Sequence, residues 1–331
     1  MHVGEGEADM RSIISLMLGL VAALFASAAV AQDYPARPVR MVVPYAPGGI
    51  NDIAARIMGN KLSEFWKQSV IIENRAGGGG IIGTDAVAKA TPDGYTVLMG
   101  SVSEYAITHH LYAKFPLNPL KDFAPIVIVG ENPMVFAANV GAPFNNVREM
   151  MAYANAQSGG LPFASAGIGS LSHLIAERFA FESHTKMLNV PYKGGGPAGA
   201  ALAGGEVLLG SFAASSVISY VKAGRMKVIA VTTARRIPLG PDWPTVAESG
   251  APGFEASNWT AMVAPAGTPR DIIMKINADA NRALKTTDVR ERLAAVGSDA
   301  AGSTPEELGT RIAEESERYG KLIKLINIKL D

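Results

Sequence analysis

The sequence predicts an α/β protein with two lobes, and three observations lead to this fold class. Short apolar stretches alternate with stretches of helical spacing along the chain. Gly-rich turns repeatedly join a strand to a helix. Without its first 31 residues the chain still has 300 residues, more than one hydrophobic core usually organises. We therefore expect one lobe from residues 32–131 plus 257–331 and a second lobe from residues 132–256.

The N-terminus has the pattern of a signal peptide. An apolar stretch, Ile13–Val30, ends in the small residues Ala29-Val30-Ala31 just before Gln32. We predict that residues 1–31 direct export to the periplasm and that cleavage falls near Ala31-Gln32. A retained membrane anchor is the alternative, because the apolar stretch is nearly long enough to span a bilayer. Three acidic residues precede Met10, which leaves Met1 or Met10 open as the natural start.

Composition excludes several classes of function. The formal net charge is 0 for the whole chain and +2 without the first 31 residues, so no broad basic surface is expected for nucleic acid. The chain has no cysteine, which rules out disulfides, thiolate metal sites and a cysteine nucleophile. We expect no cofactor, no metal, no nucleic-acid partner and a monomer. An exported chain without cysteine fits the periplasm of a Gram-negative bacterium.

The first part of the chain alternates between strands and helices. Continuous apolar residues favour buried strands, whereas apolar residues three and four apart favour helices. A Thr-Pro-Asp-Gly turn separates the second helix from the third strand. This alternation predicts a parallel sheet with right-handed crossovers. In order, the expected elements are the strand Val39–Val43, the helix Asp52–Trp66, the strand Val70–Glu73, the helix Ile82–Ala90 and the strand Tyr95–Gly100.

The remainder of the chain continues the alternation and ends in helices. Asn132-Pro133 interrupts a long strand-rich stretch, so we expect the chain to cross between lobes there. Thr304 and the following Pro305 predict the start of the last helix. The expected strands are Ala124–Val140, Pro162–Ser165, Asn189–Tyr192, Val207–Phe212, Lys227–Val231 and Ser257–Ala264, and the expected helices are Val147–Ala156, Ser170–Phe181, Pro197–Leu202, Ser216–Ala223, Asp271–Leu284, Asp288–Val296 and Pro305–Ile326.

Three strand-to-helix turns are the candidate ligand site. They span Tyr45–Asp52, Arg75–Gly83 and Ser165–His173, and we expect Asn51 or Asp52 to open the helix after the first. The unpaired amides and the dipole at a helix N-terminus attract an anion without a cationic side chain. Turns in both lobes therefore predict a cleft that holds a small anion. Ordinary N-capping by Ser170 is the alternative for the third turn.

Other motifs in these turns suggest other chemistries. Gly78–Gly83 matches G-x-G-x-x-G, but it does not follow its strand directly and lacks the later acidic residue of a dinucleotide site. Ser170 or Ser172 with His173 could form a nucleophile and base, which leaves an exported small-ester hydrolase as an alternative function. His109-His110 lacks the spacing of a metal site. We expect no catalytic residue.

Aromatic and polar side chains could line the distal part of the cleft. Tyr105, Tyr192, Phe212 and Trp259 are candidates for its walls, with core packing as the alternative for each. Lys193 precedes a Gly-rich turn and could pair with a carboxylate or face solvent.

Many short motifs spread over residues 34–326 are shared with one family. They are Tyr34-Pro35, Pro38-Val39-Arg40, Val43-Pro44 through Gly48-Gly49 with Asp52, Glu73-Asn74-Arg75, Thr91-Pro92-Asp93-Gly94-Tyr95, Lys121-Asp122-Phe123-Ala124-Pro125, Ser165-Ala166-Gly167 with Ser172-His173-Leu174, Val190-Pro191-Tyr192-Lys193-Gly194, Pro244-Thr245-Val246 and Ala264-Pro265-Ala266-Gly267. On these residues the chain resembles the substrate-binding proteins of tripartite tricarboxylate transporters, the Bug or TctC-like periplasmic receptors.

The resemblance implies a periplasmic-binding-protein type II-like fold whose two lobes close on a small organic carboxylate, and delivery of that ligand to the membrane permease subunits of the transporter. A sensing role beside a membrane kinase stays open, as does the identity of the carboxylate. One departure is the uncharged stretch Leu209–Ser215, where many relatives carry an Asp; an amino-acid ligand is therefore not expected. The expected ligand-binding residues are Tyr45, Ala46, Gly48, Gly49, Asn51, Asp52, Gly78, Gly79, Gly80, Ile81, Ser101, Tyr105, Ser165, Ala166, Gly167, Ser170, Tyr192, Lys193 and Phe212.

Overall fold

The computed structural model describes residues 34–112, 115–328 and 330. Residues 34–36 form no helix or strand, and a separate compact unit begins at Arg37. The predicted signal peptide, residues 1–31, and its cleavage site lie outside the described residues. Within the described ranges no helix combines the length and apolar character needed to cross a membrane.

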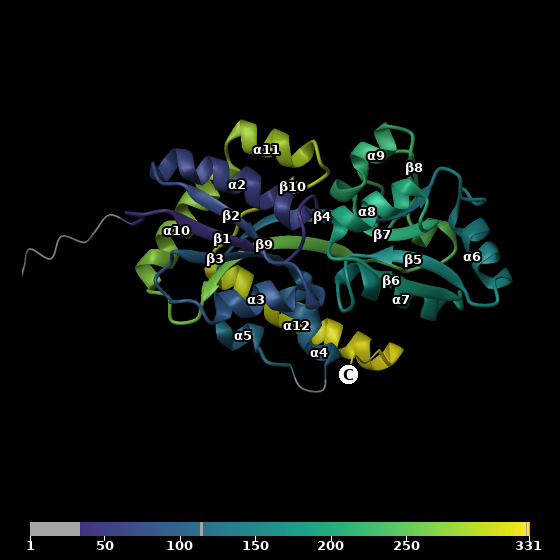
Figure 1. The fold of residues 1–331 in the computed structure, drawn as a ribbon, viewed down its shortest axis with the longest axis horizontal. Coiled ribbons are helices and arrows are strands. Elements are labelled where there is room, and N and C mark those ends of the chain that lie inside the picture. The colour runs from purple at the N-terminus through teal and green to yellow at the C-terminus, as the bar shows by residue number, and fades with distance from the viewer. Residues whose placement is uncertain (1–33, 113–114, 329, 331) are drawn as a thin grey trace, which may run out of the picture. The chain divides into compact units, whose positions relative to one another are not determined.

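The first lobe is a mixed sheet covered by helices on both faces (Figure 1). Strand β1 lies between β2 and β3 and is parallel to both, as the strand–helix alternation predicts. β9 then pairs antiparallel with β3. Figure 1 shows α2 and α11 above these strands and α3 and α12 below them. The elements are β1 (Val39–Val43), α2 (Ile50–Trp66), β2 (Val70–Asn74), η1 (Gly78–Gly80), α3 (Ile81–Ala88), β3 (Thr96–Ser101), η2 (Ser103–Ile107), α4 (Thr108–Leu111), α5 (Pro119–Asp122), β9 (Ser257–Pro265), α10 (Arg270–Leu284), α11 (Thr287–Ala294), β10 (Asp299–Ala300) and α12 (Pro305–Ile326).

The second lobe has its own sheet, in which β5 pairs parallel with both β6 and β7. Figure 1 shows α8 and α9 above this sheet and α7 below it. Its core contains a chain of aromatic rings, Phe136, Phe179 and Phe254, that contact one another in sequence. The elements are α6 (Val147–Ala156), β5 (Leu161–Ser165), α7 (Leu171–Ser183), β6 (Met187–Pro191), α8 (Gly195–Gly204), β7 (Leu209–Ala213), η3 (Ala214–Ser216), α9 (Ile218–Lys222), β8 (Met226–Val231) and η4 (Ala247–Ser249).

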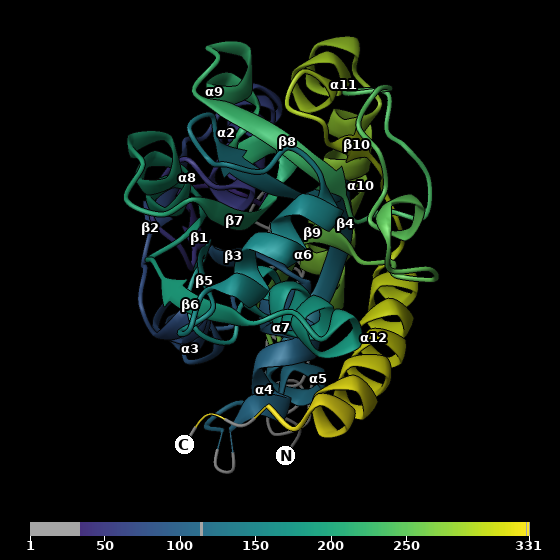
Figure 2. The same ribbon diagram turned by 90° about the vertical axis from the view of Figure 1, so that its right-hand side faces the viewer.

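One long strand, β4 (Phe123–Asn139), belongs to both sheets. It pairs with β9 from Phe123 to Pro133 and with β7 and β8 from Met134 onward. Pro133 has no N–H to donate, so a change of partner at this point costs no ladder hydrogen bond from that residue. The helix α12 also reaches the second lobe, where it lies beside α7 (Figure 2).

Most predicted elements are present, and the differences have local causes. Helix α2 begins at Ile50 with Gly49 as its N-cap, so the expected start at Asn51 or Asp52 is wrong by one or two residues. Gly48 has a φ of 91°, which turns the chain early, and the Asp52 carboxylate accepts a hydrogen bond from the Gly48 amide at 3.0 Å. At α12 the predicted cap is confirmed, because Thr304 and Glu307 form a capping box.

The stretch after β3 forms a helical turn that the sequence pattern does not predict. Ser103–Ile107 is one turn of π-helix that runs directly into α4. This turn places Tyr105 in the core of the first lobe, where its ring stacks on Trp259 at 5.8 Å between centroids. Both rings are fully buried, and the Tyr105 hydroxyl donates to the Ala261 carbonyl at 3.1 Å. For these two residues, the core-packing alternative agrees with the structure.

Candidate functional site

Loops from the two lobes meet directly at the carboxyl ends of the strands. The Ala46 amide, after β1, donates to the Lys193 carbonyl, after β6, at 2.9 Å. On the other side, the Leu171 amide of α7 donates to the Ser103 hydroxyl at 2.9 Å. A Cβ on Gly48 would lie 3.4 Å from the Gly196 Cα, so backbone packs against backbone here. These contacts describe a closed cleft.

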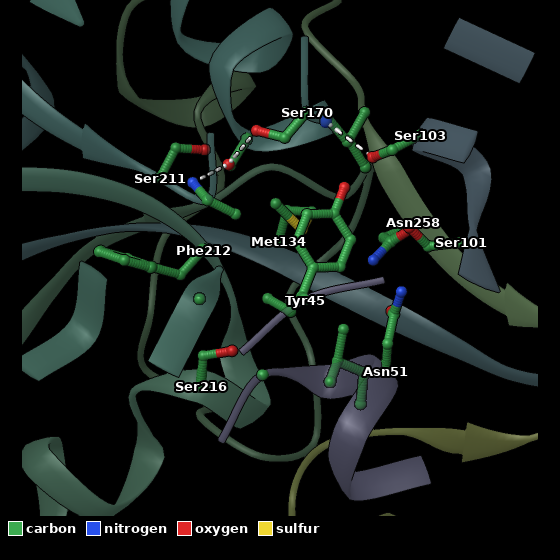
Figure 3. Close-up of a pocket in the computed structure, with 17 residues that line it drawn as sticks. Tyr45, Asn51, Ser101, Ser103, Met134, Ser170, Ser211, Phe212, Ser216 and Asn258 are labelled. Carbon is green, nitrogen blue, oxygen red and sulfur yellow. Dashed lines mark hydrogen bonds between the residues drawn. The ribbon is translucent and has the colours of Figure 1, made fainter. Parts of the chain in front are cut away.

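A small cavity of about 50 Å³ lies inside this cleft. Its wall combines residues from both lobes and from the strands that connect them (Figure 3). Among the described residues that line it, none is Lys, Arg, Asp or Glu. The wall consists of Tyr45, Gly49, Ile50, Asn51, Ser101, Ser103, Met134, Ala166, Ser170, Leu171, Ser172, Gly195, Ser211, Phe212, Ala213, Ser216 and Asn258.

Two helices direct their N-termini at the cavity without a capping side chain. The N-cap residues of α2 and α8 are Gly49 and Gly194, and neither glycine has a side chain that could accept from the first-turn amides. The two N-termini face each other, because a Cβ on Gly49 would lie 3.5 Å from the Gly195 nitrogen. The amides of the first turn carry the positive end of each helix dipole. Together they create an electropositive site made of backbone alone, which suits an anion.

Three buried polar side-chain atoms on the cavity wall have no hydrogen-bond partner among the described residues. They are Asn51 Nδ2, Ser211 Oγ and Asn258 Oδ1. Their residues are at most 5% exposed, so bulk water does not satisfy these atoms. Figure 3 shows Asn51 and Asn258 close to Ser101 on one side of the cavity, and Ser211 near Ser170 on the other. Buried polar groups are usually paired, so such a cluster indicates a place where a polar ligand binds.

Behind this wall lies a buried carboxylate, Glu104. The Tyr45 hydroxyl donates to its Oε1 at 2.6 Å, and the Ser101 amide and hydroxyl donate to its Oε2 at 2.6 and 3.0 Å. Burial raises the pKa of Glu104, although these hydrogen bonds oppose the shift. Burial, followed by the charge of Glu104, also raises the pKa of Tyr45 well above its usual value.

A wider hollow of about 460 Å³ borders the cavity at Tyr45 and Ala166. Glycines of η1 and of the β5–α7 turn form part of its wall, and Lys193 brings a positive charge to it. Tyr192 also lines this hollow, and its hydroxyl lies 3.4 Å from a carboxylate oxygen of Glu206. The other lining residues are Gly77, Gly78, Gly79, Gly80, Tyr112, Gly167, Ile168, Pro191 and Leu330.

The structure divides the expected ligand-binding residues into three groups. Seven line the small cavity: Tyr45, Gly49, Asn51, Ser101, Ala166, Ser170 and Phe212. A further six line the wider hollow: Gly78, Gly79, Gly80, Gly167, Tyr192 and Lys193. The remaining six line neither: Ala46, Gly48, Asp52, Ile81, Tyr105 and Ser165.

The residues outside both cavities have structural contacts instead. Asp52 accepts hydrogen bonds from Gly48, Arg56 and Asn74, so it holds the turn before α2. Burial alone would raise the pKa of Asp52, but these hydrogen bonds outweigh burial and lower it. Tyr105 lies in the core, and Ser165 is fully buried at the end of β5.

Sequence reasoning missed part of the wall. Gly195 could have been found, because it follows a strand and opens a helix in the same way as Gly49. Ser103, Ser211 and Asn258 carried no such signal: a single polar residue beside or within a strand does not reveal which face meets a cavity. Met134 is apolar and was indistinguishable from core.

The serines and the histidine of the third turn do not form a nucleophile–base pair. His173 Nδ1 accepts a hydrogen bond from the Gly169 amide at 3.2 Å, and its Nε2 lies 3.5 Å from Glu177. The Ser170 hydroxyl donates to the Gly167 carbonyl at 2.7 Å. Within this described turn, no hydrogen bond joins the His173 ring to either serine hydroxyl. Among the described residues there is also no group of three acidic or histidine side chains placed to bind a metal.

Two α/β lobes joined by a shared strand, with an uncharged cavity between them, define a solute-binding protein of the periplasmic-binding-protein type II class. A family model described as "tripartite tricarboxylate transporter family receptor" matches residues 54–328. The chain belongs to this family.

Individual relatives agree with this assignment. Protein BugT of Bordetella pertussis is 36% identical over 301 residues, which cover 91% of this chain and 92% of BugT. Rpa4515 of R. palustris, solved with adipate, is 32% identical with a TM-score of 0.87, covering 90% of this chain and 99% of that one. MatC of Rhodopseudomonas palustris, solved with bound malate, is 32% identical with a TM-score of 0.84, covering 88% and 100%.

Proposed function

We propose that this receptor captures a small organic carboxylate between its lobes, in the periplasm, and passes it to the membrane subunits of a tripartite tricarboxylate-type transporter. The observation that carries this proposal is the pair of uncapped helix N-termini, α2 and α8, that meet at a cavity without charged side chains. The Asn51 amide group adds an unpaired donor at the same place. The ligands in two related structures, adipate in Rpa4515 and malate in MatC, are also small organic carboxylates.

The cavity favours ligands without a positive charge. The described part of its wall contains no acidic side chain to pair with an ammonium group, and the helix N-termini would repel such a group. We therefore expect no tight binding of aspartate or glutamate. The size of the closed cavity, about 50 Å³, favours a short carboxylate, although a longer one could extend past Tyr45 toward Lys193.

Ligand binding and lobe closure form one equilibrium in this proposal. The lobes, residues 32–131 plus 257–331 and residues 132–256, separate to admit the carboxylate. They then close around it, because the ligand contacts both α2 and α8 only when they are close together. The change of partners within β4 at Pro133 is the place where we expect the chain to bend. We expect the receptor to act as a monomer without a cofactor.

The experiment is a thermal-shift screen of residues 32–331 against aliphatic and aromatic mono-, di- and tricarboxylates, with amino acids and sugars as controls. A carboxylate at 100 times its Kd adds about 2.7 kcal/mol of stability, which raises Tm by a few degrees. A shift confined to one carboxylate class supports the proposal. Shifts with sugars alone, or none with any carboxylate in protein shown by mass spectrometry to be ligand-free, contradict it.

A further inference from the structure

Glu104 lies one hydrogen bond behind the cavity wall, and the two residues that it holds both line the cavity. It is 3% exposed and sits in the π-helical turn after β3. Tyr45 and Ser101 bond its two oxygens, as described above, and the Tyr45 hydroxyl also lies 3.1 Å from the Gly79 carbonyl. A Cβ on Gly80 would lie 2.9 Å from Oε1, so the η1 loop covers the carboxylate.

No positive charge compensates Glu104 within the described part of the chain. Its neighbours on the same turn and the adjoining loop, Tyr45 and Tyr105, are neutral at ordinary pH, and its hydrogen-bond donors come from Tyr45 and Ser101 rather than from Lys, Arg or His. On the elements that pack against η2, the titratable side chains that form hydrogen bonds or ion pairs have other partners. On α12, Arg318 pairs with Glu315 and Lys321 pairs with Glu317. His109 and His110 of α4 bond the Ser316 hydroxyl of α12, and Asp122 of α5 bonds the Asn118 amide.

We propose, on the basis of the proposed function, that Glu104 is a positioning residue that makes carboxylate binding proton-linked: the receptor takes up one proton at Glu104 together with its anionic ligand. The position of Glu104 gives two reasons for this proton uptake, and the first is electrostatic. An ionised Glu104 places a negative charge behind Tyr45 and Ser101, close to where the ligand's carboxylate binds, and like charges in a buried site disfavour double ionisation.

The second effect concerns the direction of the Ser101 hydroxyl. When Glu104 is ionised, the Ser101 hydroxyl donates to Oε2, so only its lone pairs remain for the cavity. A proton on Oε2 reverses this bond: Glu104 donates to the Ser101 oxygen, and the serine hydrogen becomes free to point at the ligand. One solvent proton is gained at Oε2, and no covalent bond of the protein or ligand breaks. The neutral form therefore adds a donor where an anion needs one.

The sign of the pH dependence follows from this linkage. Because the complex holds more protons than the free receptor, affinity increases as pH falls, provided that the ligand stays ionised. Between about pH 6.5 and 8.5 the carboxyl groups of malate and adipate are ionised, so their own titration does not contribute. As the pH rises through the interval between the pKa values of Glu104 in the free and bound receptor, Kd increases by up to about tenfold for each pH unit.

Isothermal titration calorimetry with malate and adipate tests the proposal on the intact receptor. Runs at several pH values, each in two buffers of different ionisation enthalpy, count the protons exchanged on binding. We expect wild-type protein to take up as much as one proton per ligand, and Glu104→Gln to take up none and to show a Kd independent of pH. If Glu104 served only to accept a hydrogen bond from the Ser101 amide, Glu104→Gln and wild type would exchange the same number of protons on binding. The amide oxygen of the glutamine side chain can still accept that hydrogen bond.

The matched control is Glu182→Gln, which neutralises a glutamate on the exposed end of α7, where it pairs with Arg178. It should bind with the pH dependence of wild type. Binding by wild type without proton uptake overturns the inference and leaves the proposed function intact, and this measurement needs no variant. Equal proton uptake in Glu104→Gln also overturns it. If neither malate nor adipate nor any other carboxylate binds at any pH, the proposed function itself fails.

Discussion

The N-termini of α2 and α7 look alike in the sequence but differ in what their amides do. Both helices follow a strand and a turn that contains glycine. At α7 the Ser170 hydroxyl accepts from the His173 amide, and Ser103 from the other lobe accepts from the Leu171 amide. At α2 the N-cap is Gly49, and the cavity lies in front of the first turn. We therefore expect a Gly-rich turn to form an anion site only where no nearby hydroxyl already accepts from the amides of the first helical turn.

The largest expected effect comes from placing a carboxylate on the open helix. Gly49→Asp should weaken every carboxylate at least about 100-fold, because the new side chain competes for the α2 amides and repels the ligand. The φ of Gly49 is −86°, and its Cβ would meet the Gly195 nitrogen at an ordinary 3.5 Å, so the variant should fold. Calorimetry gives the Kd.

Two variants separate charge from bulk in that experiment. Gly49→Asn has the same shape without the charge and should lose less affinity than Gly49→Asp. Gly159→Asp adds the same charge at a site where a Cβ would meet nothing within 4 Å, and it should bind as wild type does. Equal affinity in Gly49→Asp and wild type would mean that the anion does not bind at α2.

Removal of the unpaired donor on α2 should have a smaller effect. Asn51→Ala should weaken carboxylate binding about tenfold, since a hydrogen bond to a charged group is worth roughly 1.5 kcal/mol or more. The stability of the ligand-free protein should change little, because Asn51 Nδ2 has no partner in the described structure. Asn189→Ala is the matched control: Asn189 Oδ1 is also unpaired among the described residues, but it lies on the edge strand β6, outside the cavity. If both variants bind alike, Asn51 does not contact the ligand.

On α7 the same kind of change should affect stability rather than binding. Ser170→Ala removes a cap and should lower the free energy of unfolding by about 1 kcal/mol, while Kd changes by no more than about twofold. Thr304→Ala removes the cap of α12, far from the cavity, and should produce a similar loss of stability. Chemical denaturation measures both. A large loss of affinity in Ser170→Ala alone would show that α7 contributes to the anion site as α2 does.

The smallest effect concerns the turn that keeps α2 open. Hydrogen bonds lower the pKa of Asp52, so its contribution to stability is present above the unfolded pKa of about 3.9 and is lost as the pH falls below that value. Asp52→Asn should lower stability by about 1 kcal/mol or less at neutral pH and should reduce the loss of stability between about pH 5 and pH 3. Thermal unfolding against pH measures this, and identical acid profiles for both proteins would contradict it.

Much of the fold could be predicted because local patterns and tertiary structure agree. The limits of β1, α6 and α12 were predicted to the residue, since an apolar run, a polar cap and a capping box define them. Tyr105 shows where such reasoning fails. The π-helical turn that carries its ring into the core depends on packing against Trp259, which comes much later in the chain. Likewise, Asn258 and Ser211 gain their place on the wall only when the strands from the two lobes come together.

The contact between Gly48 and Gly196 lies between the two lobes but outside the wall of the small cavity. A Cβ on Gly196 would lie 2.2 Å from the Pro47 carbonyl oxygen. Even alanine at this position would therefore clash with the other lobe and keep the two lobes apart. The side chains that line the cavity, such as Asn51, Ser211 and Phe212, are not part of this contact between the lobes. We therefore expect that substitutions in the cavity wall can change which ligand binds, while the glycines at the contact between the lobes preserve closure.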